Sequence, residues 1–157
     1  MTITVQIDDL SGPEIGRLLQ AHLDFAAEFT PAGSGHALDL DALRKPELTF
    51  WTAWEEQALQ GCVALKELSQ RHGEIKSMHT AQTSRGRGVA KKLLQHLIDE
   101  SMSRGYDRLS LETGNSEGFL PAQRLYQSFG FERCEPFGDY IDDPFSFCMT
   151  KLLKAQS

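Results

Sequence analysis

Apolar and polar residues alternate in several short stretches of the chain, which is the pattern of half-buried β-strands. In the first stretch, Ile3, Val5 and Ile7 are separated by polar side chains. Polar turns bound the later stretches, as in Arg71-His-Gly. The pattern predicts strands at residues 2–7, 48–54, 61–68, 74–80, 108–113, 131–134 and 145–153.

Other stretches repeat apolar residues every three or four positions, as amphipathic helices do. The clearest run contains Val89, Leu93, Leu94 and Leu97, and Gly105 follows it as a residue that ends helices well. The pattern predicts helices at residues 11–29, 39–44, 88–103 and 121–129.

The order of these elements indicates a fold class. An antiparallel meander precedes a strand–helix–strand crossover, and a further helix and strands follow. This order is typical of an α/β (α+β) fold with a central mixed sheet and helices packed on it. A length of 157 residues, 40% of them apolar, fits a single domain over residues 1–157.

The cysteines and the missing targeting signals bear on the cellular compartment. Cys62, Cys134 and Cys148 are far apart and odd in number, which argues against a zinc site and against a disulfide framework. Cys62 and Cys148 lie in apolar runs, so we expect them in the core. No signal peptide is recognisable, and no apolar run approaches the roughly 18 residues of a membrane span. We expect a soluble, cytoplasmic protein.

Charge is distributed unevenly along the chain. The formal net charge is −6, from 16 basic and 22 acidic side chains. Between Ile75 and Ile98 the chain has five basic residues and no acidic residue, so the remainder carries −6 − 5 = −11. Such an acidic remainder argues against a nucleic-acid or anionic-membrane partner, because both require clustered Lys and Arg. The basic window instead points to one small anion.

Within that window, Arg85-Gly-Arg-Gly-Val-Ala90 lies between a predicted strand and a predicted helix. Glycines permit a tight turn with converging N–H groups, and a helix start adds unpaired amides and positive potential suited to phosphate. Neither the P-loop pattern nor the dinucleotide-binding glycine pattern is present. The alternative is an ordinary strand-to-helix loop with a solvated basic face.

A second segment, Ala122-Gln-Arg-Leu-Tyr-Gln-Ser-Phe-Gly-Phe131, follows later in the chain. It resembles motif B of the GNAT superfamily of N-acetyltransferases, A-x-x-L-Y-x-x-x-G-F. The segment Arg85 to Ala90, followed by Leu93 and Leu94, resembles motif A of the same superfamily, [Q/R]-x-x-G-x-[G/A]. The resemblance covers about residues 74–131. It implies a GNAT-like acyl-CoA N-acyltransferase fold and transfer of an acetyl group from acetyl-CoA (coenzyme A), without a metal, to a primary amine of a small molecule or peptide.

The resemblance also implies how the coenzyme binds. The pyrophosphate would lie on the amides of residues 87–91, and the pantetheine arm would pair with the strand edge at residues 76–80. The parity of apolar positions changes between Ile75 and Met78, which predicts a β-bulge that turns an N–H toward the thioester carbonyl.

One position departs from the family pattern. Family members often place Asn three residues before the motif B alanine, where it contacts the cofactor. Phe119 occupies that position here, and Asn115 lies earlier in a loop. The cofactor-binding residues that the resemblance implies are Met78, His79, Thr80, Arg85, Gly86, Arg87, Gly88, Val89, Ala90, Lys91, Asn115 and Tyr126.

Tyr126 matches the motif B tyrosine, which in the family often protonates the departing sulfur. A phenol with an ordinary pKa of about 10 is a reasonable proton donor to an alkyl thiolate. The alternative is that Tyr126 is only a half-buried core aromatic.

The attacking amine must be neutral, so the reaction needs a base or a chain of water molecules. The candidate bases are Glu74, His79, Glu112 and His36, and the sequence does not choose among them. His22 and His96 are expected at solvent-exposed helix positions and receive no role.

An acidic cluster, Asp139, Asp142 and Asp143, lies before the last predicted strand. It could attract a cationic amine, or it could be a solubilising surface loop. The alternative function is a non-catalytic acyl-CoA-binding sensor or regulatory module, which would tolerate loss of Tyr126 and of every candidate base. Exposed strand edges would also permit a homodimer.

Overall fold

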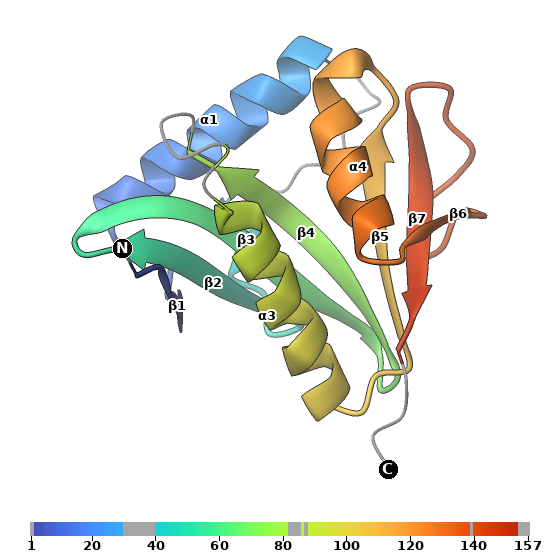
Figure 1. Ribbon diagram of the computed structural model, residues 1–157, viewed down its shortest axis with the longest axis horizontal. Helices are drawn as coiled ribbons and strands as arrows, with labels where there is room; N and C mark the ends of the chain where they lie inside the picture. Colours follow the sequence, from blue (N-terminus) through green and yellow to red (C-terminus); the bar gives the residue numbers. More distant parts are fainter. Residues whose placement is uncertain (1, 30–39, 82–85, 87, 139, 154–157) are drawn as a thin grey trace.

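The computed structural model describes residues 2–29, 40–81, 86, 88–138 and 140–153. A seven-stranded sheet crosses the molecule in the order β1-β2-β3-β4-β5-β7-β6 (Figure 1). Neighbouring strands are antiparallel except β4 and β5, which are parallel because a helix connects them. The strands are β1 (Thr4–Ile7), β2 (Leu48–Glu55), β3 (Ala58–Ser69), β4 (His72–Thr80), β5 (Arg108–Gly114), β6 (Glu132–Cys134) and β7 (Ser146–Leu152).

Helices cover both faces of the sheet (Figure 1). One face carries α1 (Pro13–Phe29) and α2 (Leu40–Leu43), and the other carries α3 (Val89–Ser103) and α4 (Leu120–Ser128). A short 3-10 helix, η2 (Glu117–Phe119), precedes α4 near the end of β5, where Phe119 contacts Phe25 of α1. Alternate residues of a strand point to opposite faces. In β3, Val63 and Leu65 therefore pack on the α3 side, whereas Cys62 and Ala64 pack on the α1 side.

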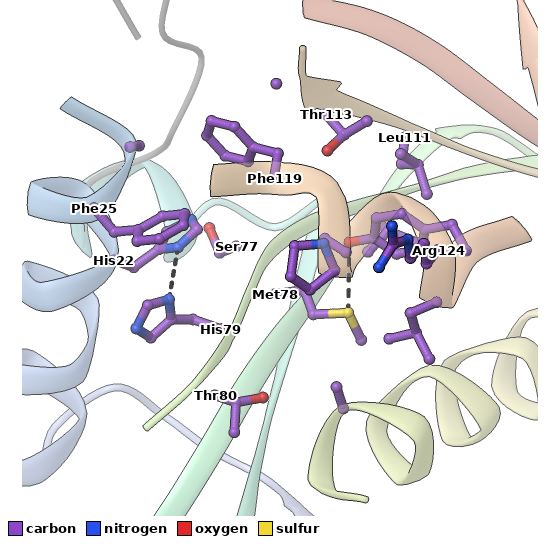
Figure 2. Close-up of a pocket in the computed structure, with 18 of the residues that line it drawn as sticks. His22, Phe25, Ser77, Met78, His79, Thr80, Leu111, Thr113, Phe119 and Arg124 are labelled. Carbon is purple, nitrogen blue, oxygen red and sulfur yellow. Dashed lines mark hydrogen bonds between the residues drawn. The ribbon is translucent and has the colours of Figure 1, made fainter. Parts of the chain in front are cut away.

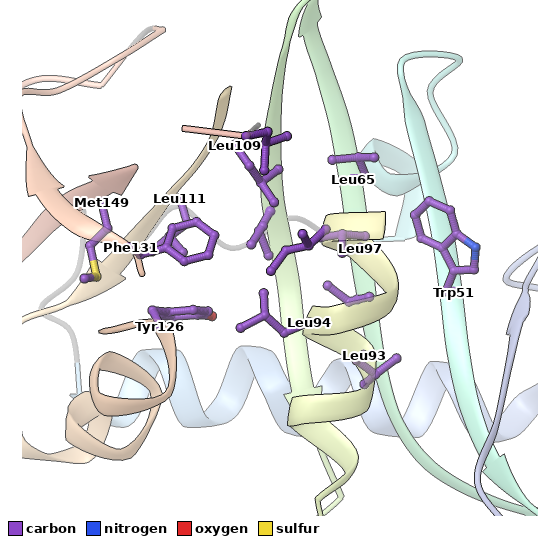
Figure 3. Close-up of a cluster of buried hydrophobic side chains, with 14 of the residues drawn as sticks. Trp51, Leu65, Leu93, Leu94, Leu97, Leu109, Leu111, Tyr126, Phe131 and Met149 are labelled. Atoms are coloured by element: carbon purple, nitrogen blue, oxygen red, sulfur yellow. The ribbon is translucent and has the colours of Figure 1, made fainter. Parts of the chain in front are cut away.

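The larger core lies between the sheet and α3 (Figure 3). Leu93, Leu94 and Leu97 of α3 are fully buried against side chains of the central strands. Each such leucine contributes on the order of 1.5–3 kcal/mol through removal of apolar surface from water. Tyr126 and Phe131 extend this core to α4. The packing fixes the first turn of α3 beside β4.

Strands β4 and β5 pair over only part of their length. Their ladder runs from His72↔Arg108 to Ile75↔Leu111 and stops there. Beyond that point β4 continues along β3, and β5 continues along β7. The two central strands therefore separate toward their carboxyl ends.

The predicted strands and helices are confirmed where the structure describes them, with their ends displaced by a few residues. Cys62 and Cys148 are buried, as expected for core residues. Among the described residues, no helix has both the length and the apolar character that a membrane crossing requires.

Candidate active site

A cleft of about 780 Å³ opens where β4 and β5 separate. Its walls come from the carboxyl ends of these two strands, the start of α3, η2 and α4, and the carboxyl-terminal half of α1 (Figure 2). Tyr140 and Ser146, near the start of β7, also line it. Such a volume is typical of small-molecule sites, and its position at the end of the parallel pair is where ligands of open α/β sheets bind.

The predicted bulge in β4 is confirmed. Cys62 of β3 pairs with His79 and Ala64 pairs with Lys76, so two residues of β4 lie opposite one residue of β3. Ser77 has a φ of 53°, an uncommon left-handed conformation for a residue other than glycine. Because β4 has no β5 partner beyond Ile75, its edge faces the cleft at and after this bulge.

The start of α3 borders the cleft, where the glycine pattern predicted an anion site. Gly88 precedes the helix with a φ of 82°, and Gly86 has a φ of 80°. A Cβ at either glycine would meet nothing within 4 Å, so the positive φ, not crowding, requires glycine there. The first turn, Val89 to Lys91, lines the cleft. These features fit a phosphate group.

Most residues that the resemblance assigned to the coenzyme are brought together. Arg85 and Arg87 lie outside the described residues. The predicted residues that line the cleft are Met78, His79, Thr80, Gly86, Gly88, Val89, Ala90, Lys91 and Tyr126.

Asn115 does not line the cleft with these residues. It is exposed and is absent from the cleft walls; its side-chain amide donates to the carbonyl of Pro144 at 3.4 Å. Phe119 lines the cleft instead, with its ring centroid 5.4 Å from that of Phe25. Its ring also crowds Gly114, where a Cβ would collide with it.

Tyr126 points its hydroxyl toward the cleft from α4. The side chain is 7% exposed, and the hydroxyl donates to the thioether sulfur of Met78 at 3.6 Å. Burial raises the pKa of Tyr126 to about 12. The phenol therefore keeps its proton at neutral pH, with only a weak acceptor beside it.

Glu112 lies on the opposite face of the sheet from Tyr126, and it also borders the opening between β4 and β5. Leu111 faces the α3 core, so Glu112, its neighbour in β5, points to the α1 face. The Ser146 hydroxyl donates to Glu112 Oε2 at 2.9 Å, and both residues line the cleft. Glu112 and Tyr126 therefore approach the cleft from opposite faces of the sheet.

Glu74 is engaged in a buried cluster beside the cleft. Its carboxylate lies 3.2 Å from Lys76 Nζ and accepts the hydroxyl proton of Tyr140 at 2.5 Å. Lys76 Nζ also donates to the Tyr140 hydroxyl at 2.7 Å. Lys76 and Tyr140 line the cleft, whereas Glu74 lies behind them, 2% exposed. Burial, with the charge of Glu74, raises the pKa of Tyr140.

This cluster changes the interpretation of the basic window. One of its five positive charges, Lys76, is balanced by Glu74. No role for Tyr140 is predictable from the sequence, because nothing local to residue 140 shows that its hydroxyl reaches residues 74 and 76.

His22 and His79 form a pair across α1 and β4. Their Nδ1 atoms are 3.2 Å apart, and both rings line the cleft (Figure 2). The expectation that His22 is solvent-exposed is wrong, because the turn of α1 directs it onto β4. Burial lowers the pKa of His22 to about 4, so this ring is neutral at physiological pH. His96 is also partly buried, and its ring centroid lies 5.4 Å from that of Trp51.

The remaining candidates do not join the site. His36 and Asp139 lie outside the described residues. Asp142 is exposed, and Asp143 accepts the backbone N–H of Phe145; neither lines the cleft. No group of three or more His, Cys, Asp or Glu side chains suited to a metal ion occurs in the part of the chain that the structure describes.

Comparisons with known proteins agree with this geometry. Residues 17–131 match the Acetyltransferase (GNAT) family. The chain is 55% identical over 149 residues to YsnE of Bacillus subtilis (strain 168), an uncharacterized N-acetyltransferase, covering 95% of this chain and 99% of YsnE.

Two solved structures share the fold. An acyl-CoA N-acyltransferase from Klebsiella pneumoniae has a TM-score of 0.81 and 27% identity, covering 97% of this chain and 98% of that one. A GNAT family acetyltransferase from Elizabethkingia anophelis, crystallised with acetyl-CoA bound, has a TM-score of 0.72 and 20% identity, covering 96% and 98%. The chain therefore belongs to the GNAT family, whose members use acetyl-CoA as co-substrate, and is an N-acetyltransferase.

Proposed function

We propose that this enzyme transfers the acetyl group of acetyl-CoA to a primary amine of a small molecule or peptide by direct attack of the amine on the thioester. The observation that carries the proposal is the placement of a protonated phenol, Tyr126, and a carboxylate, Glu112, on opposite faces of the opening between β4 and β5. The thioester would lie between them. This arrangement separates the group that protonates the leaving sulfur from the group that deprotonates the amine.

The coenzyme fits along one edge of the cleft. Its pyrophosphate would accept N–H groups at the first turn of α3, with Lys91 adding positive charge. The pantetheine amides would pair with the unpaired edge of β4 beyond Ile75. The acetyl-CoA-bound relative with the same fold supports this choice of co-substrate.

The bulge in β4 would supply the oxyanion donor. A strand that carries an extra residue turns successive N–H groups in different directions. At Ser77 and Met78 we therefore assign a backbone N–H to the thioester oxygen, where it would stabilise the negative charge that develops during attack.

The proton transfers then balance. The amine nitrogen bonds to the carbonyl carbon and gives its proton to Glu112, while the carbon–sulfur bond breaks and the sulfur takes the proton of Tyr126. Solvent returns a proton to Tyr126 and removes one from Glu112. The products are an amide and the coenzyme thiol. The raised pKa of Tyr126, about 12, keeps its proton in place until a thiolate forms.

Glu112 is the best placed of the candidate bases. Glu74 lies behind the cleft wall and is held by Lys76 and Tyr140. His79 lines the cleft on the same face as Glu112 but is paired with His22, and it stands as the second candidate.

Two measurements test the proposal. Thermal melting should show stabilisation by coenzyme A and by acetyl-CoA, and no shift with either at millimolar concentration would refute the coenzyme site. Thiol release from acetyl-CoA should then depend on addition of an amine, an amino acid, a polyamine or a peptide. Binding of acetyl-CoA without amine-dependent thiol release would favour the sensor module instead.

A further inference from the structure

The two faces of the sheet carry different charges around the cleft. On the face of α3 and α4, the cations Lys91 and Arg124 line the cleft, where the coenzyme phosphates are proposed to lie. On the face of α1, the charged side chains at the separation of β4 and β5 are Glu74, Lys76 and Glu112. With the coenzyme bound on the first face as proposed, the acceptor would enter from this second face.

Among the described residues, the three charged side chains that β4 and β5 place at this opening on the α1 face sum to −1. Lys76 is balanced by Glu74 at 3.2 Å, and both side chains are at most 10% exposed. Glu112 then adds one negative charge, next to a hydroxyl donor, Ser146. An ammonium group is attracted to such a face, whereas a second carboxylate is repelled by it.

The remainder of this face is aromatic and uncharged. Phe25 and Phe119 meet edge to face with ring centroids 5.4 Å apart, and both line the cleft (Figure 2). The ring of His79 lies 6.3 Å from that of Phe25. The phenol of Tyr140, fixed by Glu74 and Lys76, forms a further part of the wall. Aromatic rings arranged at such angles accept another ring in an edge-to-face or offset geometry.

We propose that the acceptor is a primary amine that carries an aromatic group and no carboxylate near the amine. The inference rests on the proposed acetyl transfer and names its substrate class. The ammonium group would bind at Glu112 and lose one proton through Glu112 to solvent, which gives the neutral amine. Glu112 would then take the second proton as the amide forms, and the ring would pack against Phe25 and Phe119. A free α-amino acid would bring its carboxylate within a few ångströms of Glu112, where no unbalanced cation is present among the described residues of this face.

Three matched amines test the proposal in the thiol-release assay. These are 2-phenylethylamine, phenylalanine, which adds only a carboxylate, and n-butylamine, which lacks the ring. We expect kcat/KM for 2-phenylethylamine to exceed each of the other two by at least about tenfold, which is the scale of one unfavourable charge contact or one lost ring contact.

Each other outcome overturns part or all of the inference. Equal or faster reaction of phenylalanine refutes the charge argument, and equal reaction of n-butylamine refutes the aromatic argument. Reaction with none of the three overturns the inference. The proposed acetyl transfer itself fails only if no amine, polyamine or peptide releases thiol, so the two failures are distinguishable.

Variants separate a ring contact from a general loss of structure. Phe119→Leu should lower the ratio of kcat/KM for 2-phenylethylamine to kcat/KM for n-butylamine by about tenfold. Phe145→Leu is the matched control, since Phe145 is 45% exposed and does not line the cleft. If both variants change the two amines alike, Phe119 does not select the acceptor.

Discussion

The Tyr126→Phe substitution removes one oxygen atom and should affect catalysis without affecting stability. The substitution removes a hydroxyl whose hydrogen bond in the structure is to the Met78 sulfur at 3.6 Å, so folding loses a weak interaction. We expect the free energy of unfolding to change by less than about 1 kcal/mol. If the phenol protonates the departing sulfur, kcat should fall by about 10²-fold or more, the usual contribution of a general acid, which equals about 2.7 kcal/mol of activation free energy.

Tyr106→Phe provides the matched control. Tyr106 is also buried, but its hydroxyl donates to the Glu67 carboxylate at 2.7 Å and does not line the cleft. Hydrogen bonds to a charged partner contribute more, so this variant should lose roughly 1.5–3 kcal/mol of stability and keep its kcat.

Steady-state thiol release and urea unfolding, run on both variants, give the comparison. The expected pattern is opposite in the two proteins: turnover lost with stability kept for Tyr126→Phe, and the reverse for Tyr106→Phe. Near-full turnover of Tyr126→Phe, with normal binding of acetyl-CoA by thermal shift, would remove the acid role and leave Tyr126 as a core aromatic.

Other predictions follow from single contacts. Gly88→Ala should lower the free energy of unfolding by roughly 1–2 kcal/mol and weaken coenzyme A binding in calorimetry, because the φ of 82° is strained for alanine. Gly16→Ala is the control: it lies in helix α1 with equally open space and should raise the free energy of unfolding by about 0.5–1 kcal/mol. Equal effects of the two substitutions would contradict the backbone argument. The pKa of His22 is lowered to about 4, so the unfolded chain binds more protons as pH falls below about 6.5, and stability is lost between about pH 6.5 and pH 4. By urea unfolding, His22→Gln should reduce the stability difference between about pH 8 and pH 5 by roughly 2 kcal/mol, whereas an unchanged difference would show that His22 is not buried as a neutral ring. Glu112→Gln should lower kcat by about 10²-fold with little change in coenzyme binding, and full activity would transfer the base role to His79.

Much of the fold was predicted correctly from local sequence patterns. The three- and four-residue spacing of Val89 to Met102 predicted α3, since that spacing is the burial pattern of the helix itself. The parity change after Ile75 predicted the bulge, because an extra residue shifts every later side chain to the other face. The glycines before α3 predicted a tight turn at the helix start, and Gly86 and Gly88 have the positive φ of such a turn.

Contacts between residues far apart in the sequence could not be predicted from local patterns. His22 and His79 are 57 residues apart, and Tyr140 and Glu74 are 66 apart. Their meeting depends on how α1 crosses β4 and on the path of the loop before β7, which no local spacing encodes. For the same reason the sequence left four bases open, whereas the structure places Glu74 behind the cleft wall and Glu112 within it.

A crystal structure of the complex with coenzyme A would test the central claim most directly. The account predicts the phosphates at the first turn of α3, the pantetheine arm along the edge of β4, and the coenzyme sulfur within hydrogen-bonding distance of the Tyr126 hydroxyl, in place of the Met78 sulfur that this hydroxyl now contacts. A complex in which the sulfur lies away from Tyr126, or in which coenzyme A binds outside the opening between β4 and β5, would contradict it.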